Sequence, residues 1–380
     1  MPTVQSTNIF ATAPDNATAP DSITSGNNSI WVEYGNNAKS DGSNGSSTIA
    51  QYDLLGTPQS TYTLPGLADG LKVDPTTGDV WALQNQDGNA TLTLIDPSTK
   101  QVSAPLSYAA PYTYGADSSR GYDDVAFVGR KVFLSYTNPV NPGDPVIQQL
   151  TNGTAPFGSL QTTNVLRLGD TGTNLATGET NQPLPVTDPD SLKSLPDGSL
   201  ILTGEKDQSF TIVSNPGTTQ QSASFVTLPT GSSSPDDAIM PTATSGTFYI
   251  SNQNNNDILA AKVTGLNPAD LYASVGSAVD QIDPTTGVAT PVITGLNGAH
   301  GLLFTPSSPG TPDLAALLQT VSQDLYQAFA NLGLSTDQAG SSGPGGATLN
   351  APTPSAAFVL NLATSNVSHA LAGLLPVANG

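Results

Sequence analysis

Short apolar runs alternate with turn-forming residues along roughly the first 300 positions of the chain. The runs at 30–32, 80–83, 132–134, 200–202 and 248–250 are rich in β-branched and aromatic residues. Turns containing Gly, Asn or Asp adjoin them, as at 76–79 and 196–198, and further short runs such as 91–95 follow. Runs of this length and composition, bounded by such turns, predict β-strands joined by hairpins. The pattern therefore predicts an all-β fold.

One short motif, an Asp followed by a small residue and an aliphatic residue, recurs before these strands. Five copies begin at Asp21, Asp69, Asp123, Asp190 and Asp237, and a sixth begins with a histidine, His300. Repeats of roughly 40–50 residues with about four strands each are typical of β-propeller blades. The alternative, a β-sandwich, does not require the same residue type before one strand of every unit.

The number of blades is less well determined by the repeat. Five units look complete, but the strand at His300 has no second or third strand after it. The run 6–10 near the N-terminus is suited to add a strand to the last blade and close the ring. We predict six blades, with a five-bladed ring closed by the His300 strand as the alternative.

The C-terminal part differs in kind. We expect a propeller over 1–308, a helix over 309–336, a linker rich in Gly, Ser and Pro over 337–355, and a helical tail over 356–380. Thr311, Pro312 and Asp313 form a helix start, and leucines spaced three and four residues apart follow. The helices are expected to cover part of the propeller, or to serve in oligomer formation or secretion.

Composition supports this class. Gly (37) and Pro (31) are frequent, which argues against a helical protein, and the chain has no cysteine, which excludes disulfides and thiolate sites. No conventional signal peptide and no apolar stretch of membrane-spanning length are visible. We nevertheless expect an extracellular or periplasmic location in a bacterium.

The net charge is −20, from 10 Lys and Arg against 30 Asp and Glu, and 27 of the acidic residues are Asp. Ten dispersed cations cannot neutralise a run of phosphates, so nucleic acid and anionic membrane surfaces are poor partners. A small-molecule substrate or an extracellular ligand is the expected partner.

Equivalent positions in a propeller converge on its axis, so the repeated aspartates predict a ring of carboxylates completed by His300. Such a ring must take up protons or share a cation. Oxygen ligands in a flexible ring suit Ca²⁺ better than Zn²⁺. Alternatively, each Asp caps the turn that enters its own blade.

The motif at 67–71 and 235–239 resembles that of the six-bladed calcium-dependent propellers, which include regucalcin, gluconolactonase and diisopropylfluorophosphatase. The strand at 300–304 resembles the last blade of NHL-like and streptogramin-lyase-like propellers. The resemblance implies a channel Ca²⁺ that polarises a lactone, ester or phosphoester. It makes Asp190 and Asp237 the first metal-ligand candidates, then Asp21, Asp69 and Asp123. This chain departs from the family in having Asp where Glu or Asn is usual.

Other positions complete the predicted site. Second strands end on the face where the ring opens, so Glu33, Gln84, Asn85, Glu205 and Asn252 are expected at the channel mouth. With only two histidines and no nucleophile elbow, a serine hydrolase is disfavoured.

Two hypotheses follow from these predictions. The first is a metal-dependent hydrolase in which His300 and Asp237 are the candidate base or nucleophile. The second is a non-catalytic binding or scaffold propeller whose acidic ring stabilises the fold.

Overall fold

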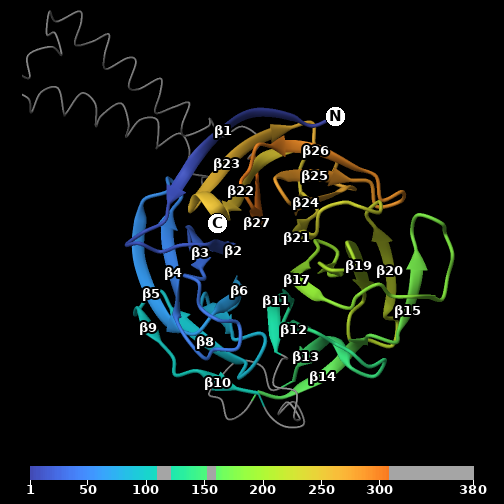
Figure 1. The fold of residues 1–380 in the computed structure, drawn as a ribbon, viewed down its shortest axis with the longest axis horizontal. Coiled ribbons are helices and arrows are strands. Elements are labelled where there is room, and N and C mark those ends of the chain that lie inside the picture. Colours follow the sequence, from blue (N-terminus) through green and yellow to red (C-terminus); the bar gives the residue numbers. More distant parts are fainter. Residues whose placement is uncertain (109–120, 152–159, 308–380) are drawn as a thin grey trace, which may run out of the picture. The chain divides into compact units, whose positions relative to one another are not determined.

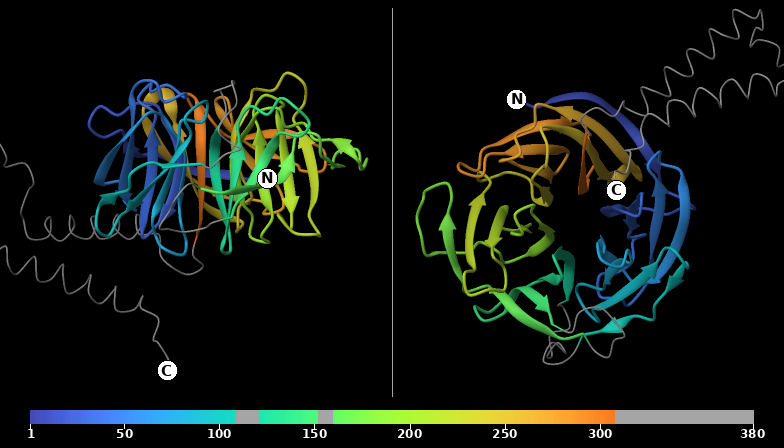
Figure 2. Two further views of the ribbon diagram at one scale, coloured as in Figure 1. Left: turned by 90° about the horizontal axis from the view of Figure 1, so that it is seen from below. Right: turned by 180° about the vertical axis from the view of Figure 1, so that it is seen from behind.

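The computed structural model describes residues 1–108, 121–151 and 160–307. Within these ranges the chain forms six β-sheets arranged as blades around a central channel (Figure 1). The innermost strands run along the axis of the ring, as the side view shows (Figure 2). The prediction of an all-β, six-bladed propeller is confirmed, and the five-bladed alternative is wrong. The predicted helices and linker after residue 308 lie outside the described residues.

The first four blades follow one another along the chain, and we number the blades 1 to 6 around the ring. Blade 1 comprises β2 (Pro20–Gly26), β3 (Ser29–Tyr34), β4 (Ser46–Asp53) and β5 (Pro58–Pro65). Blade 2 comprises β6 (Ala68–Val73), β7 (Val80–Gln84), β8 (Thr91–Asp96), β9 (Gln101–Val102) and β10 (Leu106–Ser107). Blade 3 comprises β11 (Tyr122–Val128), β12 (Lys131–Tyr136), β13 (Pro145–Leu150) and β14 (Thr162–Arg167). Blade 4 comprises β17 (Pro189–Ser194), β18 (Leu200–Gly204), β19 (Ser209–Ser214) and β20 (Ser222–Thr227), extended outward by β15 (Thr171–Asn174) and β16 (Gln182–Pro183).

Blades 5 and 6 are interleaved. The innermost strand of blade 5, β21 (Pro235–Ile239), is followed by two strands of blade 6, β22 (Ser245–Asn252) and β23 (Asp257–Thr264), with the 3₁₀ turn η1 (Gln253–Asn255) between them. The chain then returns to complete blade 5 with β24 (Leu271–Val275), β25 (Ala278–Ile282) and β26 (Ala289–Thr294). It ends in β27 (Ala299–Pro306), the innermost strand of blade 6.

This crossover corrects one prediction and explains another observation. The run 248–250 does not belong to the same blade as the motif at 236–238, because β22 pairs with β27 and not with β21. The second and third strands that appear to be missing after His300 precede it in the sequence. The predicted N-terminal strand is confirmed: β1 (Thr3–Thr12) pairs with β23 on the outside of blade 6.

Every innermost strand carries a β-bulge at the same height. In blade 1, Pro20 and Ile23 pair with Tyr34 and Val32, so two residues of β2 face one residue of β3. The same break in register occurs in β6, β11, β17, β21 and β27. A bulge bends the strand and redirects its unpaired residues. The repeated motif of the sequence is therefore a repeated bulge.

Apolar contacts between neighbouring blades hold the innermost strands in place. Trp81 of blade 2 packs in one buried cluster with Val125 and Leu134 of blade 3, and Phe210 of blade 4 shares another with Leu271 of blade 5. Burial of such side chains from water is the main favourable term in folding. The core thus lies between the blades and leaves the bulges facing the channel.

Candidate functional site

The first residue of each bulge forms a ring around the channel. These ring residues are Asp21, Asp69, Asp123, Asp190, Asp236 and His300. Their carboxyl groups influence one another electrostatically, as Asp69 does with Asp21 and Asp123, and Asp190 with Asp236. The repeat therefore places five acids and one histidine at equivalent positions, as the sequence predicts, but the fifth acid is Asp236.

The fifth repeat is offset by one residue from its predicted alignment. Pro235 pairs with Val275 and Ala238 with Ala273, which makes Asp236 and Asp237 the bulge. Asp237 occupies the second bulge position, where the other blades have Ser22, Gly70, Asp124, Ser191 and Gly301. Its side chain is turned away from the ring: it is only 5% exposed and forms an ion pair with Lys193.

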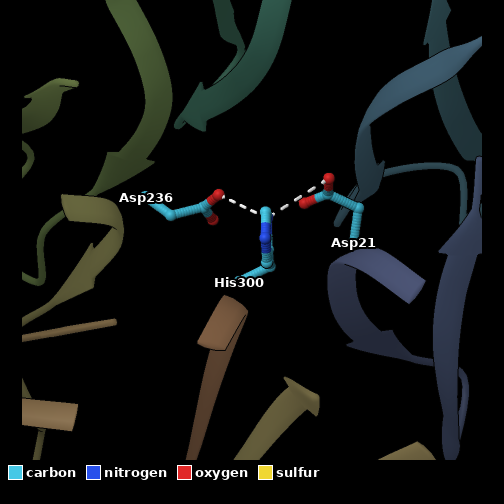
Figure 3. Close-up of side chains that lie close together, drawn as sticks. All are labelled: Asp21, Asp236 and His300. Atoms are coloured by element: carbon cyan, nitrogen blue, oxygen red, sulfur yellow. Dashed lines mark ion pairs between the residues drawn. The ribbon is translucent and has the colours of Figure 1, made fainter. Parts of the chain in front are cut away.

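Asp21, Asp236 and His300 form the tightest group of the ring (Figure 3). Nδ1 of His300 lies 2.7 Å from Oδ2 of Asp236 and 3.6 Å from Oδ2 of Asp21. Gln253 donates a hydrogen bond of 3.3 Å to the same Asp21 oxygen. One potential ligand atom from each of the three ring residues lies within 4.8 Å of the other two. Three blades, 5, 6 and 1, thus contribute to one group.

The two carboxylates keep His300 charged. Burial alone lowers the pKa of His300, but its contacts with Asp21 and Asp236 outweigh this effect and raise the pKa to about 11. Burial and the charge of Asp21 raise the pKa of Asp236 to about 7, and His300 acts in the opposite direction. At neutral pH the imidazole is therefore a cation held between the two acids.

The other ring acids lie on the opposite side, in blades 2, 3 and 4. Burial raises the pKa of Asp69, Asp123 and Asp190 well above the usual range, and neighbouring carboxyl groups add to the effect. A carboxyl group in this situation binds a proton in preference to carrying a charge. The ring thus divides into a half around the charged His300 and a half in which burial and neighbouring carboxyl groups raise the pKa of all three aspartates.

Glu33 is a further acid behind the ring. It lies on β3 opposite the bulge of blade 1, is only 1% exposed, and neither carboxyl oxygen has a well-formed hydrogen bond to a described residue. Burial, together with Asp21 and Asp69, raises the pKa of Glu33, and the nearby hydroxyl of Ser47 opposes the shift. Glu33 is therefore buried beside the ring, whereas the sequence places it at the channel mouth.

Of the other residues predicted at the channel mouth, some are buried like Glu33 and some are exposed. Gln84 is buried and donates to the carbonyl of Pro65, and Asn252 is buried and bonds to Asp257 and to the backbone of Asn297. Glu205 is exposed, and its pKa is raised by burial of part of its carboxyl group and by Asp188, whereas His300 lowers it.

Asn85, the remaining predicted mouth residue, directly follows β7 and is partly exposed, with a left-handed φ of 62°. Its amide side chain donates to the carbonyl of Asn89 in the same loop. Glu205 and Asn85 thus keep some exposure, and His300 acts electrostatically on the carboxyl group of Glu205.

The donor set at the tight group fits a divalent cation. Two carboxylates and one imidazole combine the oxygen ligands that Ca²⁺ and Mn²⁺ take with the nitrogen ligand that Zn²⁺ and Mn²⁺ accept. Cation binding would have to displace the proton of His300, because a metal ligand must offer a free lone pair. Binding would therefore release a proton and strengthen as pH rises.

Comparisons with known proteins yield similar structures only. No family model and no curated protein matches the sequence. A streptogramin B lyase structure is 15% identical over 79% of this chain and 94% of its own, with a TM-score of 0.47. A periplasmic gluconolactonase from Pseudomonas aeruginosa is 12% identical over 76% and 89%, with a TM-score of 0.46. A virginiamycin B lyase from Staphylococcus aureus is 13% identical over 80% and 96%, with a TM-score of 0.44.

The similar structures thus include a gluconolactonase and two lyases. Separately, the described residues contain no helix long and apolar enough to cross a membrane.

Sequence reasoning missed Asp236 and Gln253. A signal for Asp236 is present: a proline directly precedes the ring acid in three blades, at Pro20, Pro189 and Pro235. Aligning the prolines in place of the aliphatic residues gives the correct register. No sequence signal identifies Gln253. It lies in the turn after β22, and β22 belongs to blade 6 although it directly follows the innermost strand of blade 5 in the sequence.

Proposed function

We propose that the protein binds a divalent cation at Asp21, Asp236 and His300 and uses it to hydrolyse a lactone, ester or phosphoester. The observation that carries the proposal is the spacing of these three side chains, whose potential ligand atoms lie within 4.8 Å of one another. They come from three different blades, so the spacing is a property of the whole ring. When bound, the cation would polarise the carbonyl or phosphoryl oxygen of the substrate.

The chain's own residues supply the remaining chemistry. Asp69, Asp123 and Asp190 face the cation site from the other half of the ring, and burial raises the pKa of each. A raised pKa suits a carboxyl group to exchange protons with a substrate, because the group holds a proton more readily than an ordinary aspartate. We therefore assign proton transfer to this half. Asp237, the base or nucleophile predicted from the sequence, is engaged with Lys193 and Leu302 instead.

A cation titration tests the proposal. Ca²⁺, Mn²⁺ and Zn²⁺ are each added to the purified protein, and thermal unfolding is followed. A ligand at 100 times its Kd stabilises a folded protein by about 2.7 kcal/mol, so at least one of the three is expected to raise the Tm clearly. Asp236→Asn and His300→Gln should each abolish the increase. The matched control is Asp283→Asn, which changes an exposed turn aspartate outside the channel.

Activity is tested next, on a panel of lactones, carboxylic esters and phosphoesters. The expected result is turnover that requires the cation and falls at least about 100-fold in Asp190→Asn, the order of magnitude that a general acid or base contributes. A Tm that none of the three cations changes would refute the metal site. Cation binding without turnover would favour the non-catalytic binding propeller. The expected extracellular or periplasmic location and oligomer formation stay predictions.

A further inference from the structure

We propose that the buried pair Lys193 and Asp237 positions His300 and Asp236, setting the spacing of the cation site. The link to cation binding rests on the proposed function, whereas the contacts that the pair makes do not. Neither residue belongs to the ring. Lys193 lies on β17 of blade 4 and Asp237 on β21 of blade 5, and their side chains are 12% and 5% exposed.

The pair binds both backbone groups of one residue in β27, Leu302. Oδ2 of Asp237 accepts a hydrogen bond of 2.7 Å from the N–H of Leu302, and the ammonium of Lys193 donates to the carbonyl of Leu302. Leu302 is two residues after His300, at the end of the bulge. Asp237 itself directly follows Asp236. The same pair therefore fixes the backbone next to two of the three proposed cation ligands.

Two more contacts extend the constraint. Ser274 on β24 fixes the main chain of Asp237: its hydroxyl oxygen accepts from the N–H at 3.0 Å and donates to the carbonyl at 3.3 Å. Gly301 lies against blade 1, where an added Cβ would come within 2.3 Å of the carbonyl oxygen of Asp21. Blades 5, 6 and 1 are thus in contact through these backbone groups, which leaves the side chains little freedom to separate.

A second pair of the same design provides a control within the same molecule. Lys72 of blade 2 pairs with Asp124 of blade 3 at 2.9 Å, and Oδ2 of Asp124 accepts from the N–H of Leu192 in blade 4 at 3.0 Å. Ser135 contacts the backbone of Asp124 as Ser274 does that of Asp237. This pair lies beside Asp123 and Asp190, in the other half of the ring. A purely structural role predicts equal effects when either pair is removed.

The experiment compares two double variants of the full chain, Lys193→Met with Asp237→Asn and Lys72→Met with Asp124→Asn. Each double variant removes both charges of a buried ion pair. Removing only one of them would leave a buried charge without a partner, which is the change that most endangers folding. Urea unfolding measures the stability of both. Imidazole NMR signals of the cation-free protein at constant pH report on His300, and His300→Gln distinguishes them from those of His369. Titration calorimetry with the cation that raises the Tm measures affinity.

The first double variant is expected to shift the His300 signals and to weaken cation binding by about 10-fold to 100-fold, the usual effect of losing groups that orient metal ligands. The second is expected to leave both unchanged at a comparable loss of stability. Equal changes in both variants, or unchanged His300 signals in the first, would overturn the proposal. If the wild type binds no cation, the proposed function fails, and the His300 signals still decide whether the pair positions this side chain.

Discussion

At the scale of single residues, the ring aspartates make the stability of the propeller depend on pH. Burial and neighbouring carboxyl groups raise the pKa of Asp69, Asp123 and Asp190 in the folded protein. Because the folded-state pKa exceeds the unfolded value of about 4, the folded protein binds more protons between the two. The stabilisation is complete below the unfolded pKa and is lost as pH rises through the folded one.

We therefore expect the free energy of unfolding to decrease as pH rises above the unfolded pKa of about 4, with a slope of up to about 1.4 kcal/mol per pH unit for each proton. Asp190→Asn should reduce the slope and raise stability at the alkaline end of the series, because the variant has no buried carboxyl group to ionise at this position. Urea unfolding at several pH values measures both. Asp283→Asn should not reduce the slope, because hydrogen bonds from Thr285 lower the pKa of that exposed carboxyl group. An unchanged slope in Asp190→Asn would contradict the assignment.

The bulge residues also show how far the sequence predicts the site. The recurring aspartates and His300 identify the ring, because equivalent positions in a propeller must meet at the axis. The motif does not fix which residue of the doublet at 236–237 faces the channel. That choice depends on pairing with β24, where Ser274 lies 37 positions after Asp237 and beyond two strands of another blade. Side-chain contacts such as Gln253 with Asp21 depend on the same crossover.

At the scale of strands, β1 completes blade 6 as its outermost strand. It pairs along β23 through the register from Thr3 to Thr12, and its carbonyl at Thr12 accepts a hydrogen bond from Tyr52 in blade 1. Without β1, the backbone of β23 would become an exposed sheet edge, and unpaired edges promote association between molecules.

Deletion of residues 1–12 is accordingly expected to lower stability and to cause aggregation. Light scattering during size-exclusion chromatography and urea unfolding measure the two effects. The control is deletion of residues 1–2 alone, which precede the strand. A shortened chain that stayed monomeric and equally stable would show that β1 does not contribute to ring closure. The run 6–10 predicts this strand, although its length and its partner follow only from the structure.

At the scale of the whole molecule, the charge of −20 acts on anything that approaches the channel. The ring carboxyl groups line the channel, where Glu205 acts electrostatically on Asp190, and Asp188 acts on Asp123. A field of this sign attracts cations and repels anions, and dissolved salt screens it with a Debye length of about 10 Å at 0.1 M.

Cation affinity should therefore fall as the NaCl concentration rises from 0.02 M to 0.5 M, by more than it does in a variant carrying Asp188→Asn and Glu205→Gln. Both exchanges leave the proposed ligands intact. Titration calorimetry at each salt concentration provides the measurement. Equal salt dependence in the two proteins would mean that the charges of Asp188 and Glu205 do not affect cation binding.

The interleaving of blades 5 and 6 has a consequence for how this architecture changes over evolution. Propellers are repeat structures, and in blades 1 to 4 one continuous segment encodes one blade, so a duplication or deletion of that segment adds or removes a complete unit. Residues 235–306 instead encode most of two blades with their strands intermixed. No continuous piece of this segment encodes one blade alone, so duplicating or deleting any single piece affects strands of both blades or leaves blade 6 incomplete. The crossover thereby protects from loss the part of the ring that carries Asp236 and His300.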